Sequence, residues 1–251
     1  MRTLAELARH LNLSGSRPPL VLVTDERRLP DPCPAAARLP PGSLVILRHY
    51  DTPDRRALAG RLARLCRARR LRLLIAADLD LAVALGTGLH LPEGLARSPA
   101  PRLRLWHRRS RLPLTVAAHG RMALVRAARL GADAALLSPV FATASHPEAR
   151  GLGAVAFRRL VRRAKLPVYA LGGVNRATVG HLKGSGAAGV AAISGFCRGA
   201  MDHGANGPHL SPPFVLPPSG RARRPLVVPD TCDTRRVWVD RFHPLPAATK
   251  V

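Results

Sequence analysis

The sequence predicts an α/β fold, a (β/α)8 barrel that closes on itself, with an irregular C-terminal tail. Eight short apolar runs of strand length recur between residues 19 and 195. Segments with helical spacing separate most of these runs, and connections of that length join parallel strands. The last two runs both end in glycine, at the position where barrels of this kind commonly bind phosphate. A doubly wound open sheet is the alternative, and the count of eight favours the barrel.

The predicted strands and helices alternate along the chain. Strands are predicted at 19–25, 43–50, 71–77, 88–92, 112–119, 134–141, 167–173 and 189–195. Helices are predicted at 54–70, 78–86, 121–131, 154–165 and 175–186. The helix over 54–70 carries Leu58, Leu62 and Leu65 at helical spacing with arginines on the other face, which is typical of a helix packed on a sheet. Residues 93–112 are rich in arginine, and periodicity gives a helix there little support.

The chain divides into three segments. Residues 1–17 are expected to form an N-terminal helix and linker, and residues 18–196 the barrel. Residues 197–251 contain nine prolines and many arginines without sustained periodicity. This tail is therefore expected to be irregular and poorly ordered.

The formal net charge of +25 raises the question of nucleic-acid binding. Arginine accounts for 37 of the 40 basic residues, and these arginines are spread over helix faces with few aromatics between them. We therefore expect non-specific attraction to polyanions but no specific nucleic-acid partner. No apolar run reaches the length of a membrane span, and no secretory leader is recognisable. The expected location is the cytoplasm, with no membrane partner, and the oligomeric state is left open.

The stretch PVYALGGVN, residues 167–175, ends an apolar run in two glycines. Gly172 and Gly173 allow backbone N–H groups to approach an oxyanion, because no Cβ stands in the way. The next run ends in Ser194 and Gly195, whose hydroxyl and amides are placed to face the same point. These features predict a phosphate site after the last two strands. The alternative is that the glycines serve tight turns alone.

Residues 18–196 resemble the thiamine phosphate synthase / TenI family. The resemblance rests on LVTD, VILR, LLIAADLDLAVALGTGLHLPE, GADAALLSPVFAT, VYALGGVN and GAAGVAAISGF, in this order. It implies a (β/α)8 barrel. The family's synthases join a pyrimidine diphosphate to a thiazole phosphate with Mg²⁺ and release diphosphate, and TenI-like relatives include thiazole tautomerases. The resemblance thus implies a phosphorylated heterocycle as the small-molecule partner.

The resemblance assigns roles to individual residues. The positions that hold the thiazole phosphate are Gly172, Gly173, Ile193, Ser194 and Gly195. The positions implied to bind substrate are Arg48, Thr143, Ser145 and His146. Ser145 stands where a second threonine is usual, and His146 stands where a loop lysine is usual.

The metal and diphosphate positions depart from the family pattern. Ala76 and Ala77 stand where the synthases have Asn-Asp, and Leu95 stands where a metal-binding aspartate is expected. Mg²⁺ needs oxygen ligands, and these side chains supply none. Mg²⁺ is therefore a doubtful cofactor, and Asp78 and Glu93 are the weak candidates for a relocated site. Two further departures are Ile46 for glutamine and Tyr50 for lysine.

The catalytic residues are not identified by the sequence. His49, His119 and His146 lie near predicted strand ends or on a loop, so each is a candidate acid, base or phosphate donor. Each also has the simpler interpretation of a solvated or hydrogen-bonded histidine. Three hypotheses follow: a phosphate-binding barrel with weak or lost synthase activity, an active synthase with relocated metal ligands, and a non-enzymatic binding or regulatory protein.

Overall fold

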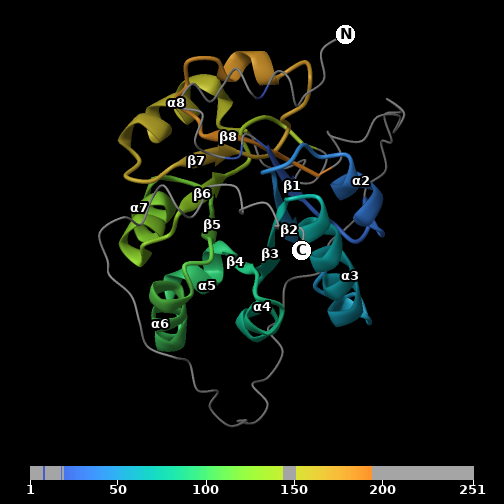
Figure 1. Ribbon diagram of the computed structural model, residues 1–251. Helices are drawn as coiled ribbons and strands as arrows, with labels where there is room; N and C mark the ends of the chain where they lie inside the picture. The colour runs from blue at the N-terminus through green and yellow to red at the C-terminus, as the bar shows by residue number, and fades with distance from the viewer. Residues whose placement is uncertain (1–7, 9–17, 19, 144–150, 194–251) are drawn as a thin grey trace, which may run out of the picture.

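The computed structural model describes residues 8, 18, 20–143 and 151–193. Eight parallel strands form one closed barrel in chain order, with β8 pairing with β1. The strands are β1 (Leu20–Val23), β2 (Leu44–Leu47), β3 (Arg72–Ala76), β4 (Gly88–Leu91), β5 (Leu114–Ala118), β6 (Ala134–Leu137), β7 (Val168–Ala170) and β8 (Gly189–Ala192). Helices surround the strands (Figure 1). The predicted (β/α)8 barrel is confirmed, and each predicted strand is present in a shorter form.

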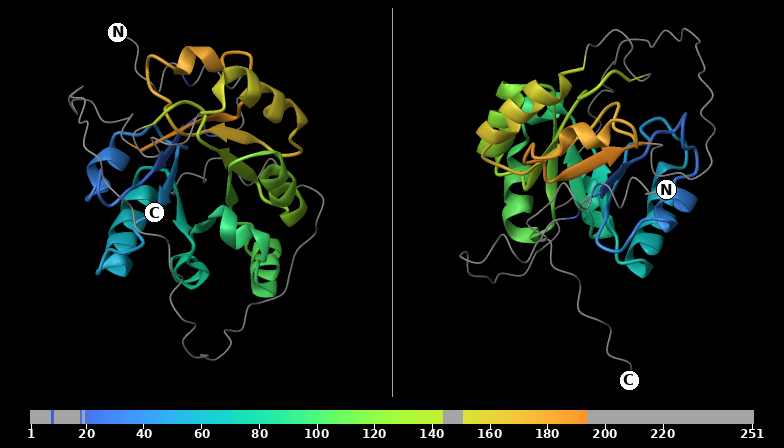
Figure 2. Two further views of the ribbon diagram at one scale, coloured as in Figure 1. Left: turned by 180° about the vertical axis from the view of Figure 1, so that it is seen from behind. Right: turned by 90° about the horizontal axis from the view of Figure 1, so that it is seen from above.

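The alternation of side chains along each strand divides the core into two layers. Val21 and Val23 of β1 pack inside the barrel with inward residues of the other strands, such as Tyr169. Leu20 and Leu22 face outward and pack against the helices. Because both faces of every strand are covered, the strands are apolar almost throughout. The view from above in Figure 2 shows the helices outside the ring of strands.

The helices lie mostly where their periodicity places them. They are α2 (Cys33–Ala37), α3 (Arg55–Ala68), α4 (Leu79–Leu85), α5 (Glu93–Arg97), α6 (Pro101–Ser110), α7 (Arg121–Leu130) and α8 (Gly153–Arg163). Leu58 and Leu62 of α3 are buried against the barrel, as their spacing predicts. Leu65 is partly buried and packs against the same core.

Three connections differ from the prediction. The helix predicted over 175–186 is reduced to a single 3-10 turn, η1 (Val179–Leu182), because Gly180, Gly184 and Gly186 weaken a helix there. The short helix α2, which begins with a proline in its first turn, was not predicted. The weakly patterned region 93–112 contains two helices, α5 and α6, separated by a short break.

Among the helices that the structure describes, none is long and apolar enough to cross a membrane. The expected N-terminal helix and the tail from 197 to 251 lie outside the described residues, apart from Ala8, which is buried in the outer core.

Candidate functional site

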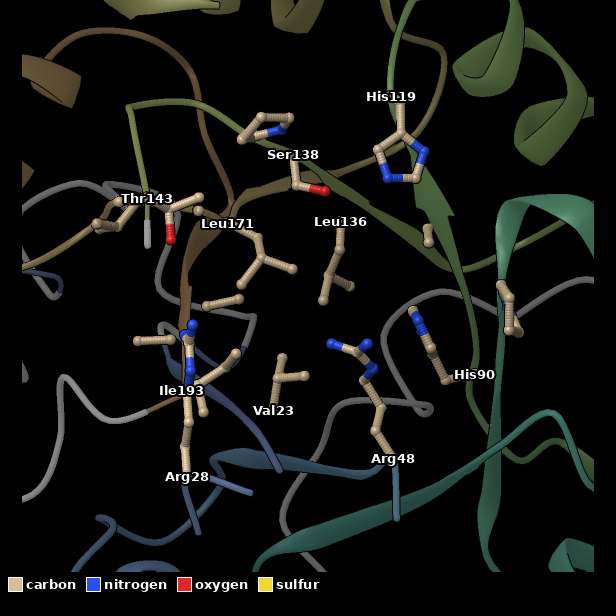
Figure 3. A pocket seen from close by; sticks show the side chains of 18 of the residues that line it. Val23, Arg28, Arg48, His90, His119, Leu136, Ser138, Thr143, Leu171 and Ile193 are labelled. Carbon is tan, nitrogen blue, oxygen red and sulfur yellow. The ribbon is translucent and has the colours of Figure 1, made fainter. Parts of the chain in front are cut away.

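A cavity of about 470 Å³ opens at the carboxyl ends of the strands. This is the end of a (β/α)8 barrel where substrates bind. Its wall combines apolar side chains with a few polar ones (Figure 3). The apolar members include Val23, Leu136, Leu171 and Ile193, and the polar members include Arg28, Arg48, Tyr50, His90, Glu93, His119, Ser138, Thr143 and Asn175. A ring-shaped ligand with an anionic group suits such a lining.

The polar residues of the cavity follow from the alternation of each strand. Arg48 lies two positions after the inward Ile46, and Ser138 lies two positions after the inward Leu136. His119 likewise follows Ala117, another residue of the cavity wall. Side chains two apart in a strand share a face. The inward face of each strand therefore continues as the wall of the cavity.

Gly172 and Gly173 line the cavity and adopt φ angles of +88° and +65°. A Cβ on Gly173 would meet the carbonyl oxygen of Ala142 at 2.4 Å, and one on Gly172 would meet Pro139 Cα at 2.8 Å. The loop after β7 is thus pressed against the loop after β6, where Phe141 N donates to Gly172 O at 3.0 Å. Close packing between these loops is one reason why both positions are glycine. It is compatible with the predicted phosphate site, because the same glycines border the cavity.

The rest of the predicted phosphate site is partly described. Ile193 lines the cavity, whereas Ser194 and Gly195 lie outside the described residues. Asn175 forms a turn in which its Oδ1 accepts from Ala177 N at 2.8 Å and Thr178 N at 3.1 Å. Thr178 Oγ1 in turn donates to Gly173 O at 2.8 Å. The side chain of Thr178 thus fixes the backbone at Gly173.

Arg48 enters the cavity from the end of β2, held by a buried hydrogen-bond chain. Arg48 N donates to Thr24 Oγ1 at 3.0 Å, and Thr24 Oγ1 lies 2.8 Å from His49 Nδ1. His49 Nε2 lies 3.1 Å from Leu29 O, which accepts only. In the neutral form of His49, the proton therefore lies on Nε2, and Nδ1 accepts from Thr24 Oγ1. His49 is buried outside the cavity wall, and these contacts favour the hydrogen-bonded interpretation of this candidate.

His119 lines the cavity, and the carboxylate of Glu93 fixes its orientation. His119 Nδ1 lies 2.8 Å from Glu93 Oε2, which also accepts from His119 N at 3.0 Å. Glu93 Oε1 accepts from Arg126 Nη2 at 2.6 Å and lies 3.5 Å from Arg97 Nη2. Burial raises the pKa of Glu93, but the hydrogen bonds from His119 and the charges of His119 and Arg126 outweigh it, so the pKa lies below its usual value. Figure 3 shows His119, His90 and Arg48 around the same space.

His90 is a cavity residue to which the sequence, by its place inside a short strand, assigned only a structural role. It is buried in β4, and its Nδ1 lies 2.8 Å from Thr115 Oγ1. Burial, with a smaller contribution from the charge of Arg48, lowers the pKa of His90 to about 3. The imidazole is therefore neutral at ordinary pH. A signal was available, because His90 alternates with the outward Leu89 and Leu91 and so faces the barrel interior.

The side chain of Arg55, which belongs to α3, reaches the end of β3. By the resemblance described above, this is where the family has metal ligands. Arg55 Nη2 donates to Ala76 O, and Arg55 Nη1 lies 3.1 Å from Asp78 Oδ2. Asp78 also caps α4 by accepting from Leu81 N at 2.9 Å. The centroid of the Tyr50 ring lies 6.0 Å from Cζ of Arg48 and 5.7 Å from Cζ of Arg55. These contacts are cation–π interactions.

The described residues do not fit a magnesium ion. Ala76, Ala77 and Leu95 offer no side-chain oxygen, and Mg²⁺ requires oxygen ligands in near-octahedral geometry. The oxygens of the two candidates are committed elsewhere, those of Asp78 to Arg55 and Leu81, and those of Glu93 to His119 and Arg126. Within the described part of the chain, no three His, Cys, Asp or Glu side chains come together to bind a metal.

Two further residues of the cavity were not predicted, Arg28 and Ser138. Arg28 belongs to the loop after β1, whose turn is fixed by Asp25 Oδ1 accepting from Arg28 N at 3.0 Å. Loops give no periodic signal, which is why the sequence did not identify this arginine. Of the predicted substrate-binding set, Arg48 and Thr143 line the cavity. Ser145 and His146 lie outside the described residues.

The fold and the cavity define a (β/α)8 barrel with a small-molecule site at the carboxyl ends of its strands. A family model described as thiamine monophosphate synthase matches residues 20–196. The chain therefore belongs to the thiamine monophosphate synthase family, and the predicted resemblance is confirmed.

Individual relatives support the same assignment. A putative thiamine-phosphate synthase 2 of Aquifex aeolicus is 34% identical over 157 residues, which cover 61% of this chain and 82% of the relative. A putative thiamine-phosphate synthase of Geobacter sulfurreducens is 37% identical over 157 residues, covering 60% and 71%. The solved thiamine phosphate pyrophosphorylase of Pyrococcus furiosus shares the fold, with a TM-score of 0.56 and 22% identity over 75% of this chain and 88% of its own.

Proposed function

We propose that this barrel binds a phosphorylated thiazole or pyrimidine of thiamine biosynthesis, and that its synthase activity is weak or lost. The observation that carries the proposal is the end of β3. There, alanines stand at the metal positions, and the neighbouring Asp78 is already bound to Arg55. The cavity for the ligand is therefore present. The described residues, however, lack the metal ligands through which a departing diphosphate would be neutralised.

The lining of the cavity suits the proposed ligand in two parts. Val23, Leu136, Leu171 and Ile193 provide apolar surface for a heteroaromatic ring. The backbone at Gly172 and Gly173 borders the same space, and Arg28 and Arg48 bring two guanidinium groups to it. Glu93 also borders the cavity, but its charge is offset by Arg126. The described wall therefore has an excess of positive charge, which favours an anionic ligand.

Loss of the metal ligands bears directly on the chemical step. When bound, Mg²⁺ stabilises the negative charge that develops on a departing diphosphate. In this chain the cationic groups of the described wall that could face that charge are the guanidinium groups of Arg28 and Arg48. Arginine stabilises phosphate charge through hydrogen bonds but supplies a single positive charge. These groups suit binding of a phosphorylated ring better than expulsion of diphosphate.

The test combines a binding assay with a product assay. Calorimetric titration with thiazole phosphate and with the pyrimidine diphosphate measures affinity, with and without Mg²⁺. Thiamine phosphate is then followed by chromatography after incubation with both substrates and Mg²⁺, beside the thiamine-phosphate synthase of Geobacillus kaustophilus as a positive control. We expect binding of at least one compound, little dependence on Mg²⁺, and product far below the control.

Each other result selects a different hypothesis. Product formation equal to the control and abolished by EDTA would identify an active synthase with relocated metal ligands. Binding without any product, even at high protein concentration, would show that the synthase activity is lost rather than weak, and would then favour a binding or regulatory role. Failure to bind either compound would contradict the proposal.

A further inference from the structure

The charged residues of this protein are unevenly distributed over the barrel. The last quarter of the described chain, residues 151–193, contains no aspartate or glutamate. It contains seven basic residues, namely Arg158, Arg159, Arg162, Arg163, Lys165, Arg176 and Lys183. Four of these belong to one helix, α8. A surface of unbalanced positive charge is therefore concentrated on one side of the molecule.

The structure places the four arginines of α8 on its outer face. Phe157 is fully buried, and Leu160 and Val161 pack against the barrel core. Arg158, Arg159, Arg162 and Arg163 are exposed. They form two pairs four residues apart, so the members of each pair are separated by about 6 Å along the helix axis. We call this surface the α8 arginine face.

The turn η1 extends the α8 arginine face. Arg158 Nη2 donates to Lys183 O at 3.1 Å, which joins the end of η1 to α8. Lys183 is exposed there. Figures 1 and 2 show α8 and η1 next to each other on the outside of the barrel. The face lies on the outer wall and shares none of its four arginines with the wall of the ligand cavity.

Three of the other helices each carry an arginine that is paired with a carboxylate. Arg55 of α3 pairs with Asp78, Arg102 of α6 pairs with Asp80, and Arg126 of α7 pairs with Glu93 at 2.6 Å. Among the salt bridges between described residues, none involves α8. The α8 arginine face thus differs from α3, α6 and α7, each of which carries at least one arginine paired with a carboxylate.

We propose that the α8 arginine face binds the phosphate backbone of nucleic acid without regard to sequence. Guanidinium groups match phosphate oxygens through paired hydrogen bonds, and releasing counterions from the nucleic acid drives such binding. The exposed face of α8 carries no aromatic side chain that would stack on bases. Its apolar residues face the barrel, apart from the exposed Val155, so the helix lacks an apolar face for insertion into a lipid surface.

The experiment measures salt-dependent binding of a fluorescent 20-base-pair duplex by anisotropy. The test variant replaces the four arginines of the α8 arginine face by glutamine. The control variant removes the same charge from α3 by changing Arg56, Arg61, Arg64 and Arg67 to glutamine. All eight side chains are exposed on helices, and glutamine has a helix propensity close to that of arginine. Circular dichroism verifies that both variants are folded.

We expect the full chain to bind the duplex with micromolar or weaker affinity at physiological salt, as non-specific complexes do. The slope of log K against log salt should fall by about 0.9 for each phosphate contact removed, so by about 3 to 4 in the α8 variant. The control variant should lose less than about one unit of slope.

Three results would overturn the proposal. Equal losses of slope in both variants would show that net charge alone attracts the duplex. No binding at 50 mM salt would show that the face does not bind nucleic acid. Tight binding to vesicles of anionic lipid, with none to duplex, would assign the face to a membrane surface instead.

Discussion

The two sides of the cavity mouth are built in different ways. On the side of β7 and β8, the wall near Gly172 and Gly173 is formed by backbone that approaches the neighbouring loop closely. On the side of β2 to β4, the wall is formed by the side chains of Arg48, Tyr50 and Glu93. By the resemblance described above, Gly172 and Gly173 match the family pattern, whereas Tyr50 on the second side departs from it. A backbone-built site is constrained by packing, whereas a side-chain-built site changes with each substitution.

This difference bears on the proposed loss of synthase activity from a barrel that retains its cavity. Any side chain at Gly173 would collide with Ala142. The packing of the two loops therefore requires glycine at this position, independently of ligand binding. Ala76 and Ala77 supply no side-chain oxygen ligand, and the barrel closes without one. The side chain of Arg55 reaches the end of β3 and binds Ala76 O. The fold is therefore compatible with loss of the metal ligands.

The largest effect is expected from Gly173→Val. The substitution places a β-branched residue at φ +65°, with its Cβ 2.4 Å from Ala142 O and 2.7 Å from Phe141 Cβ. Left-handed strain and overpacking together should lower the free energy of unfolding by about 2–4 kcal/mol, and binding of thiazole phosphate should be lost. Urea unfolding and calorimetry measure the two effects.

Gly184→Ala is the matched control for this change. Gly184 has a similar φ of +67°, but nothing lies within 4 Å of an added Cβ. We expect a cost of about 1–2 kcal/mol from the backbone alone and unchanged ligand affinity. If Gly173→Val cost no more than the control, the close approach of the two loops would not be a constraint.

Thr24→Val tests the hydrogen-bond chain that holds Arg48. The hydroxyl is buried, and its removal leaves Arg48 N and His49 Nδ1 without their partner. The free energy of unfolding should fall by about 1–3 kcal/mol, and affinity for phosphorylated ligands should weaken because Arg48 loses its support. Thr87→Val is the control, since that hydroxyl donates over 3.5 Å to Ala82 O, and a loss below about 1 kcal/mol is expected. Equal effects of the two changes would show that the hydrogen bonds of Thr24 do not stabilise the position of Arg48.

Glu93→Gln tests the wall that is built from side chains, through the pH dependence of the free energy of unfolding. The folded pKa of Glu93 lies below its usual value of 4.5, so its stabilisation is present above that pH and is lost as the pH falls through the folded pKa. The variant should be less stable by about 1–2 kcal/mol at pH 7. The difference should shrink below pH 4.5, because glutamine does not titrate. Urea unfolding at pH 7, 5 and 3.5 measures this difference.

Asp80→Asn provides the comparison for the Glu93 experiment. Asp80 pairs with Arg102 in the exposed manner, with 76% and 64% of the two side chains accessible. Exposed pairs of this kind contribute about 0–1 kcal/mol, so a small change at every pH is expected. A difference between wild type and Glu93→Gln that stayed constant with pH would show that the carboxylate charge of Glu93 is not stabilising.

The sequence predicts most of the fold because apolar spacing determines which face of each element is buried. The eight strands follow from apolar runs such as 134–137 and 189–192, which are buried on both faces. The connection after β7 was misjudged, because three glycines limit it to a 3-10 turn although its apolar residues have helical spacing. Helix α2 was missed because a five-residue helix is too short to show a period.

The site was less predictable than the fold. Gly172 and Gly173 were found because they end an apolar run, Arg48 was found through the family resemblance, and all three line the cavity. Arg28 lies on a loop, and the alternation around His90 alone does not distinguish a cavity wall from a filled interior. The pairing of Glu93 with Arg126 spans 33 residues, and no local pattern encodes such a contact. Long-range contacts of this type decide which charged groups remain available to a ligand.

The smallest expected effect concerns Ala77, on the altered side of the mouth. Ala77 adopts φ +61°, a conformation that costs an L residue about 1–2 kcal/mol and that asparagine, aspartate and glycine tolerate better. The side chain is exposed, and Ala77 N donates to His90 O at 2.9 Å in a bond that glycine retains. Ala77→Gly should therefore raise the free energy of unfolding by about 0.5–1 kcal/mol, after the greater flexibility of unfolded glycine is subtracted. Ala76→Gly, in the buried strand beside it, should lower that energy, and urea unfolding compares the two. A stabilising Ala77→Gly would show that the left-handed backbone at Ala77 is strained by its Cβ, whereas a destabilising one would show that the loop accommodates alanine without such strain.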